Sequence, residues 1–338
     1  MKNKFTVVFC GFLAFLCLFN NSLLGQDLHF TQFPLSPLTL STANAGDFYG
    51  TYRVGGIFRS QFNGTSGVKG YSTMLGYVDA PLPWAFRSQD WLGLGIIYAN
   101  DKAGIGGLGR SEFLVNVAYH LAFDKSGKNH LSLGYQTGSI GLKLLDPSKL
   151  VFYDLTSGLI NSDDINLINQ KKSSFTEHAA SAHLQLSLSS RVRMKFGFTM
   201  AHLGKPKAVV TTQGNFRLPQ RQTYFGQLDI LLTKSLALYP ALIYQVSAKQ
   251  KEFGAHALAS YQLQKENNLR VNAGLGLRQG DSYQFLAGFD YKTIKFGAAF
   301  DITSSLLRPN NGIELGISYI GRIFKTPNPK QVIICPRF

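Results

Sequence analysis

The sequence of 338 residues is poor in cysteine, in charged residues and in long apolar runs. It holds three cysteines, and charged residues make up 16% of the chain, against roughly 25% in a typical soluble domain. Beyond the N-terminus there is no run of about 18 apolar residues, which excludes a helical membrane protein. The 26 Phe and 15 Tyr side chains exclude disorder, because they offer ample surface to bury. A soluble all-β protein and a transmembrane β-barrel remain.

The first 25 residues have the pattern of an export signal. Lys2 and Lys4 form a basic start, residues 5–19 are almost wholly apolar, and residues 20–25 are mostly small or polar. We therefore expect a signal peptide over residues 1–25, followed by a single domain over residues 26–338.

Cleavage of this signal would remove two of the three cysteines, Cys10 and Cys17, and leave Cys335. A single cysteine excludes an intramolecular disulfide and a cysteine-rich metal site. An exported protein of this size without disulfides needs another source of stability, and closure of a β-barrel in lipid would provide one.

Apolar and polar residues alternate with a period of two along most of the chain. Near the end of the sequence, Glu314, Gly316 and Ser318 occupy every second position, and the positions between them hold Ile313, Leu315, Ile317 and Tyr319. Segments of about ten residues with one apolar face and one polar or glycine face are typical of transmembrane barrels. A soluble sandwich also alternates, but its polar faces carry more Lys and Glu than these do.

The alternation predicts an all-β fold, a transmembrane antiparallel β-barrel of about 14 strands. The expected strands are residues 52–61, 69–79, 90–100, 111–122, 130–142, 174–189, 191–203, 221–232, 234–247, 252–263, 268–279, 281–290, 292–302 and 311–323. The longest connection, Lys143–Lys172, is the expected surface loop or plug. After the last strand, residues 325–338 form a C-terminal tail.

One glycine-rich motif has the residue spacing of a nucleotide-binding loop. Gly104, Gly106 and Gly109 satisfy the spacing G-x-G-x-x-G, which binds a pyrophosphate only where it opens a helix. Here an alternating strand follows the motif, so we expect a turn at the barrel rim.

No catalytic or metal-binding constellation stands out in the sequence. Glu177, His178 and His183 lie close together, but positions 178 and 183 differ by five and so face opposite sides of a strand. No G-x-S-x-G motif and no paired carboxylates occur. We expect no enzyme activity, no metal and no cofactor.

Basic residues exceed acidic ones, which gives a formal charge of +15 at pH 7. There is no basic run of five residues, so nucleic acid is not the expected partner. Arg191, Arg193 and Lys195 share one strand face and predict a basic lumen or rim. This charge would either meet an anionic partner or be solvated in a wet interior, and both alternatives stay open.

A set of short motifs, in order from residue 26 to 338, resembles the PorP/SprF family of outer-membrane proteins of the Bacteroidota type IX secretion system. The opening Gln26-Asp27-Leu28-His29-Phe30-Thr31-Gln32-Phe33 resembles the family's Q-D-x-x-F-x-Q-F, and the last four residues resemble its C-P-R-F terminus. One departure is Thr42, which stands where the family usually has a proline. Other matching segments are residues 36–38, 53–54, 58–62, 71–73, 100–104, 118–120, 202–206, 300–306 and 312–315.

This resemblance implies a non-enzymatic outer-membrane barrel that binds, anchors or helps export a secreted protein such as a surface adhesin, in some members linked to gliding motility. The implied partners are outer-membrane lipid, other secretion components and the secreted substrate. A passive porin or small-molecule transporter is the alternative, and an outer-membrane enzyme ranks third among the functional hypotheses. We further hypothesise that Cys335, Pro336, Arg337 and Phe338 serve assembly or partner docking.

Overall fold

The computed structural model describes residues 28, 30–61, 70–83, 85–104, 107–144, 172–208, 217–248, 250–304 and 311–323. Three expected features lie outside these residues: the signal peptide, the loop over residues 145–171 and the C-terminal tail. No helix among the described residues is long and apolar enough to cross a membrane.

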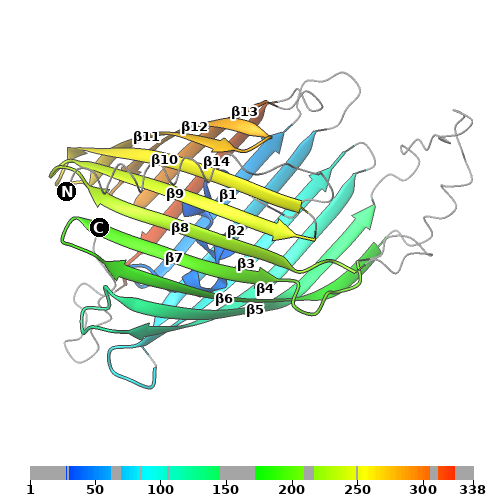
Figure 1. The fold of residues 1–338 in the computed structure, drawn as a ribbon, viewed down its shortest axis with the longest axis horizontal. Coiled ribbons are helices and arrows are strands. Elements are labelled where there is room, and N and C mark those ends of the chain that lie inside the picture. The colour runs from blue at the N-terminus through cyan, green and yellow to red at the C-terminus, as the bar shows by residue number, and fades with distance from the viewer. Residues whose placement is uncertain are drawn as a thin grey trace, which may run out of the picture.

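The described residues form a closed antiparallel barrel in which every strand pairs with its neighbours in sequence and β14 pairs with β1 (Figure 1). This confirms the predicted fold class and the count of 14 strands. The strands are β1 (Tyr52–Gln61), β2 (Tyr71–Leu82), β3 (Trp91–Ala103), β4 (Leu108–Ala122), β5 (His130–Leu144), β6 (Lys172–Ser187), β7 (Val192–Ala201), β8 (Arg221–Leu231), β9 (Leu236–Ser247), β10 (Gln250–Gln264), β11 (Leu269–Arg278), β12 (Ser282–Tyr291), β13 (Ile294–Thr303) and β14 (Gly312–Gly321).

The wall is apolar outside and polar inside. In β14 the outward side chains Ile313 and Ile317 are each 52% exposed, whereas the inward Glu314 is 1% exposed. A soluble protein would bury the isoleucines and solvate the carboxylate. The inverted arrangement is that of a barrel whose outer face meets lipid.

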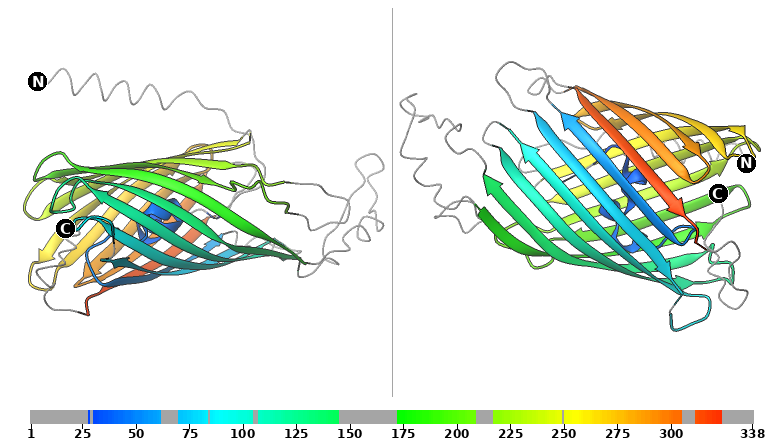
Figure 2. Two further views of the ribbon diagram at one scale, coloured as in Figure 1. Left: turned by 90° about the horizontal axis from the view of Figure 1, so that it is seen from below. Right: turned by 180° about the vertical axis from the view of Figure 1, so that it is seen from behind.

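The two ends of the barrel differ in their connections (Figure 2). We call one the short-turn end; there β1 begins, β14 ends, and tight hairpins such as residues 265–268 and 292–293 join the strands. The opposite, long-loop end carries the longest connections, residues 145–171 and 202–220. The glycine-rich motif joins β3 to β4 at this end, as the sequence predicts for a turn.

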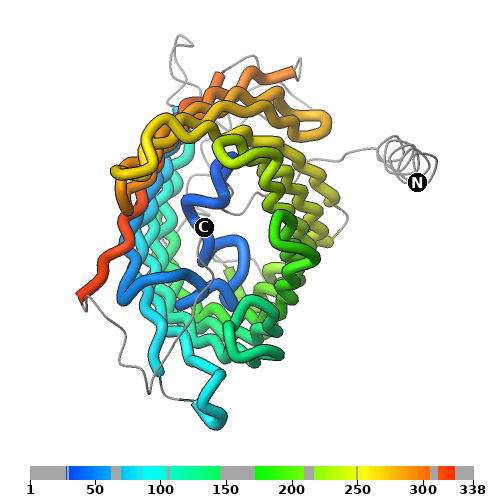
Figure 3. The backbone as a smooth tube through the Cα atoms, turned by 90° about the vertical axis from the view of Figure 1, so that its left-hand side faces the viewer, coloured from blue at the N-terminus to red at the C-terminus, as the bar shows by residue number. Residues whose placement is uncertain are grey.

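A segment before β1 fills the lumen. Residues 30–50, which we call the lumenal plug, run inside the ring of strands (Figure 3). They contain the short helical turns η1 (Phe33–Leu35), α2 (Pro37–Leu40) and η2 (Thr42–Asn44). Prolines near the start of η1 and at the start of α2 interrupt any strand, because proline has no backbone N–H to donate. In a barrel of eight strands, side chains alone can fill the lumen. A barrel of 14 strands is wider, and here the plug occupies the remaining space.

The alternation pattern does not predict this role for the N-terminal segment. The predicted loop or plug is residues 143–172, but residues 143 and 144 belong to β5 and residue 172 begins β6. The plug has no period-two pattern, so the criterion that found the strands gave no signal for it. Its two prolines and the absence of alternation between residues 26 and 51 are the features that could have indicated it.

Glycines on the wall bring the plug backbone into direct contact with the strands. A Cβ atom on Gly134 of β5 would lie 2.3 Å from the Ala43 nitrogen, and one on Gly93 of β3 would lie 1.8 Å from the Ala45 oxygen. Both partners are main-chain atoms of the plug, so no side-chain rotation would relieve these clashes. The plug is therefore fitted to the wall at these two points.

We predict that Gly134→Val destabilises the barrel, because overpacking of this kind costs about 1–3 kcal/mol. The measurement is the urea midpoint in detergent, followed by the gel mobility of the folded barrel. Gly76→Val is the matched control, since a Cβ on outward-facing Gly76 meets nothing within 4 Å. Equal midpoints for the two variants would contradict the fit of the plug to β5.

Candidate functional site

The plug is held in the long-loop half of the lumen by a buried cluster of charges around Arg59 of β1. Arg59 lies 2.9 Å from the Asp301 carboxylate and 3.2 Å from that of Glu314. The Glu314 carboxylate also accepts hydrogen bonds from the backbone N–H groups of Thr31, at 2.9 Å, and Gln32, at 2.6 Å. Two acids and one arginine from three strands thus share their hydrogen bonds with the start of the plug.

A second cluster, around Arg53 of β1, holds the plug nearer the short-turn end. The guanidinium forms a bidentate pair with Asp79 of β2, at 2.9 and 2.8 Å. Asp79 also accepts a 2.8 Å bond from the Gly46 N–H, and Arg53 donates to the Asn44 carbonyl at 3.1 Å. Both partners of this ion pair belong to the wall, and the plug is held by its two hydrogen bonds to them, of the stronger kind that involves a charged group.

A third cluster surrounds Asp47, beyond η2 in the plug. Lys195 of β7 contacts one carboxylate oxygen of Asp47. His130 and His183 approach the same carboxylate at 3.3 and 3.2 Å. Burial alone would raise the pKa of the Asp47 carboxyl, but the nearby charges, above all that of Lys195, outweigh it and hold the pKa well below its usual range. Asp47 is therefore a buried carboxylate and not a carboxylic acid.

The structure separates the three basic residues that the sequence analysis grouped. Arg193 and Lys195 point into the lumen, where Arg193 lies 3.4 Å from Asp229 and Lys195 meets Asp47. Arg191 is exposed in the turn before β7. The two lumenal cations thus have acidic partners within the chain, and these partners could not be foreseen from the local pattern because they lie far away in the sequence or in the plug.

The histidines follow the predicted parity of β6. His183 is fully buried in the lumen, whereas the outward-facing His178 bonds to Tyr135 at 2.7 Å. Glu177 faces inward and bonds to His202 at 2.6 Å, so it does not join His183 in a cluster. The histidines that do accompany His183 come from neighbouring strands.

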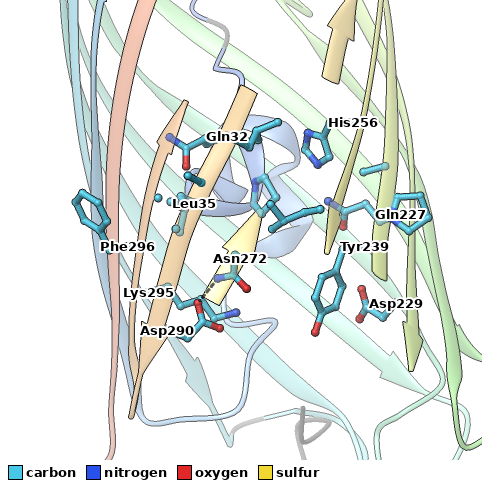
Figure 4. A pocket seen from close by; sticks show the side chains of 18 of the residues that line it. Gln32, Leu35, Gln227, Asp229, Tyr239, His256, Asn272, Asp290, Lys295 and Phe296 are labelled. Atoms are coloured by element: carbon cyan, nitrogen blue, oxygen red, sulfur yellow. Dashed lines mark hydrogen bonds between the residues drawn. The ribbon is translucent and has the colours of Figure 1, made fainter. Parts of the chain in front are cut away.

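A cavity of about 300 Å³ lies between the plug and strands β8 to β13 (Figure 4). Its apolar part includes Leu35 of the plug and Leu286. Five of its polar side chains lie near the short-turn ends of their strands: Asp229, Tyr239, Asn272, Asp290 and Lys295. A neighbouring cavity of about 130 Å³ reaches Arg193 and Lys195 and shares Gln227 and Asp229 with the first.

Comparison with known proteins identifies the family. The sequence matches the family described as type IX secretion system membrane protein PorP/SprF over residues 22–319. The chain belongs to this family. The match covers most of the chain and confirms the resemblance drawn from its short motifs. None of the curated proteins matches the chain in sequence.

Among solved structures, this family member is similar in fold to a channel and a transporter. The CymD monoaromatic hydrocarbon channel is 12% identical, with a TM-score of 0.51, and the match covers 88% of this chain and 94% of that one. The toluene transporter TodX of Pseudomonas putida is 10% identical, also with a TM-score of 0.51, over 87% and 94% of the two chains. At such low identity the likeness concerns the fold alone.

We predict that Arg59→Met destabilises the barrel by about 3–5 kcal/mol, because it leaves Asp301 and Glu314 buried without their cation. The measurement is again the urea midpoint of the folded barrel. The triple variant Arg59→Met, Asp301→Asn, Glu314→Gln should recover part of the loss.

The matched control for this prediction is Arg191→Met. Arg191 is exposed in the turn before β7, so its removal should change the midpoint little. A loss for Arg59→Met no larger than for Arg191→Met would show that the buried cluster does not stabilise the barrel.

Proposed function

We propose that this protein is a non-enzymatic outer-membrane component of type IX secretion that binds or anchors an exported protein, without conducting that protein through its own lumen. Family membership supports the place in secretion. The observation that carries the rest is the plug, which is tied to the wall by two buried ion-pair clusters.

The plug extends along the lumen. Thr31 bonds to Glu314, which lies near the long-loop end of β14, whereas Asp47 meets Lys195 in the half of the lumen nearer the short-turn end. To open a passage wide enough for a polypeptide, the chain would have to break the hydrogen bonds from the plug to both ion-pair clusters of the wall and separate Asp47 of the plug from Lys195. A role as scaffold or anchor requires no such opening.

The surface for a partner is proposed to lie at the short-turn end. Bacterial outer-membrane barrels generally have short turns in the periplasm and longer loops outside. With that orientation, the cavity of Figure 4 and the exposed Arg191, in the turn before β7, lie toward the compartment from which an exported protein arrives. β14 ends at the same end, at Gly321, and the tail from residue 325 follows it in the sequence.

A passive channel for small molecules is the second candidate. The cavity with apolar lining favours it, and two proteins of similar fold are named as a hydrocarbon channel and a toluene transporter. The two functions differ in what they require of the lumen, because a channel needs a continuous path past the plug.

Conductance in planar bilayers separates the two candidates. We predict that the purified barrel shows no steady ion conductance, since the plug lies along the lumen and is hydrogen-bonded to the wall near both ends. An open porin inserted in the same bilayers is the positive control. Steady conductance of the wild-type barrel, or saturable uptake of a small solute by vesicles that contain it, would favour the channel.

The anchoring role is tested in the bacterium that carries the gene. Removal of the protein should abolish surface display of its secreted partner, and the partner should co-purify with the barrel from wild-type membranes. We predict that deletion of residues 335–338 lowers either the amount of barrel in the outer membrane or the display of the partner. Normal levels of both would exclude a role for these four residues.

A further inference from the structure

Asp47 and three histidines form a closely packed group between the plug and the wall. His120 of β4, His130 of β5 and His183 of β6 are each at most 1% exposed. Their rings follow one another along the wall, with centroids 5.9 Å apart for both His120–His130 and His130–His183. Ligating atoms of Asp47, His120 and His130 all lie within 4.8 Å of one another.

Main-chain carbonyls fix the tautomers of two of these rings. The Nδ1 of His130 lies 2.9 Å from the Gly127 oxygen, and the Nε2 of His120 lies 2.8 Å from the Ala45 oxygen. A carbonyl oxygen only accepts, so each of these nitrogens carries the proton. In a neutral ring, the other nitrogen then presents a lone pair.

The unprotonated nitrogen of a neutral His130 ring, Nε2, faces the Asp47 carboxylate and cannot donate a hydrogen bond to it. This nitrogen is buried without a hydrogen-bond partner and lies 3.3 Å from the Asp47 oxygen Oδ1. A lone pair opposite a carboxylate oxygen is repulsive, and a buried polar atom without a partner is destabilising. A cation between the two atoms would satisfy both.

The geometry suits a metal ion. Two ligands at about 2.0–2.1 Å from a tetrahedral zinc ion are separated by about 3.3 Å, which is also the distance from His130 Nε2 to Asp47 Oδ1. Histidine ligands characteristically donate their other ring N–H to a carbonyl, as His120 and His130 do here. We propose that Asp47, His120 and His130 bind a divalent transition-metal ion of the zinc type, which joins the plug to β4 and β5.

Two neighbouring groups bear on this site. Lys195 contacts Asp47 through the oxygen Oδ2 and leaves Oδ1 on the side of His130. His120 Nδ1 lies 2.6 Å from the Ser132 hydroxyl, which must release this nitrogen when the metal binds. The rival occupant is a proton on His130, which would make that ring an imidazolium beside Asp47.

The test measures binding of Zn²⁺ to the refolded barrel, purified with an affinity tag that contains no histidine. We expect about one equivalent of Zn²⁺ in the wild type by elemental analysis, and a Co²⁺ derivative with the visible absorption of a low-symmetry N/O site. His130→Gln and Asp47→Asn should bind Zn²⁺ more than about tenfold more weakly. His178→Gln, which changes a histidine on the outer face, should bind as the wild type does.

Folding of each variant is checked by the gel mobility of the intact barrel. If Asp47→Asn fails to fold, His120→Gln replaces it as the second ligand variant, with the same expected loss of Zn²⁺ binding. Zn²⁺ should also raise the urea midpoint of the wild type and of His178→Gln, but not that of His130→Gln. A wild-type barrel that binds no Zn²⁺ would overturn the proposal in favour of the protonated ring. Undiminished binding by folded His130→Gln would overturn it too. None of these measurements depends on a role in secretion.

Discussion

The organisation of this protein depends on one constraint: a sheet that closes on itself in lipid has no edge, and its outer face must be apolar. Because side chains alternate, an apolar outside sends most polar residues of the strands inward. The lumen therefore collects Arg53, Arg59, Asp79, Asp301 and Glu314, all of them buried. Such charges are tolerated only when they are paired and hydrogen-bonded.

The plug supplies a large part of those partners. Its backbone N–H groups bond to Glu314 and Asp79, and its carbonyls accept from Arg53 and His120. The plug in turn has little regular structure of its own, so its polar backbone groups need the wall. Each part satisfies groups that the other leaves open, and this mutual dependence makes a filled barrel the stable form.

Part of the excess positive charge lies inside the lumen of the folded chain, where it is paired with carboxylates. Arg53, Arg59, Arg193 and Lys195 all point into the lumen, and each lies against a carboxylate of the same chain. These four cations are structural in the first place. The positive charge free to meet a partner must come from exposed residues such as Arg191.

The sequence by itself determined the strands, their number and the face of most strand residues, since a period of two is a local property that lipid makes strict. It placed His178 and His183 on opposite faces and identified the glycine-rich motif as a turn. Only the tertiary structure decided which inward residues meet across the lumen. Arg59 finds its acids 242 and 255 positions away, and Asp47 meets histidines from two strands. The plug, which brings these groups together, has no period, because its conformation follows from the shape and charge of the wall around it.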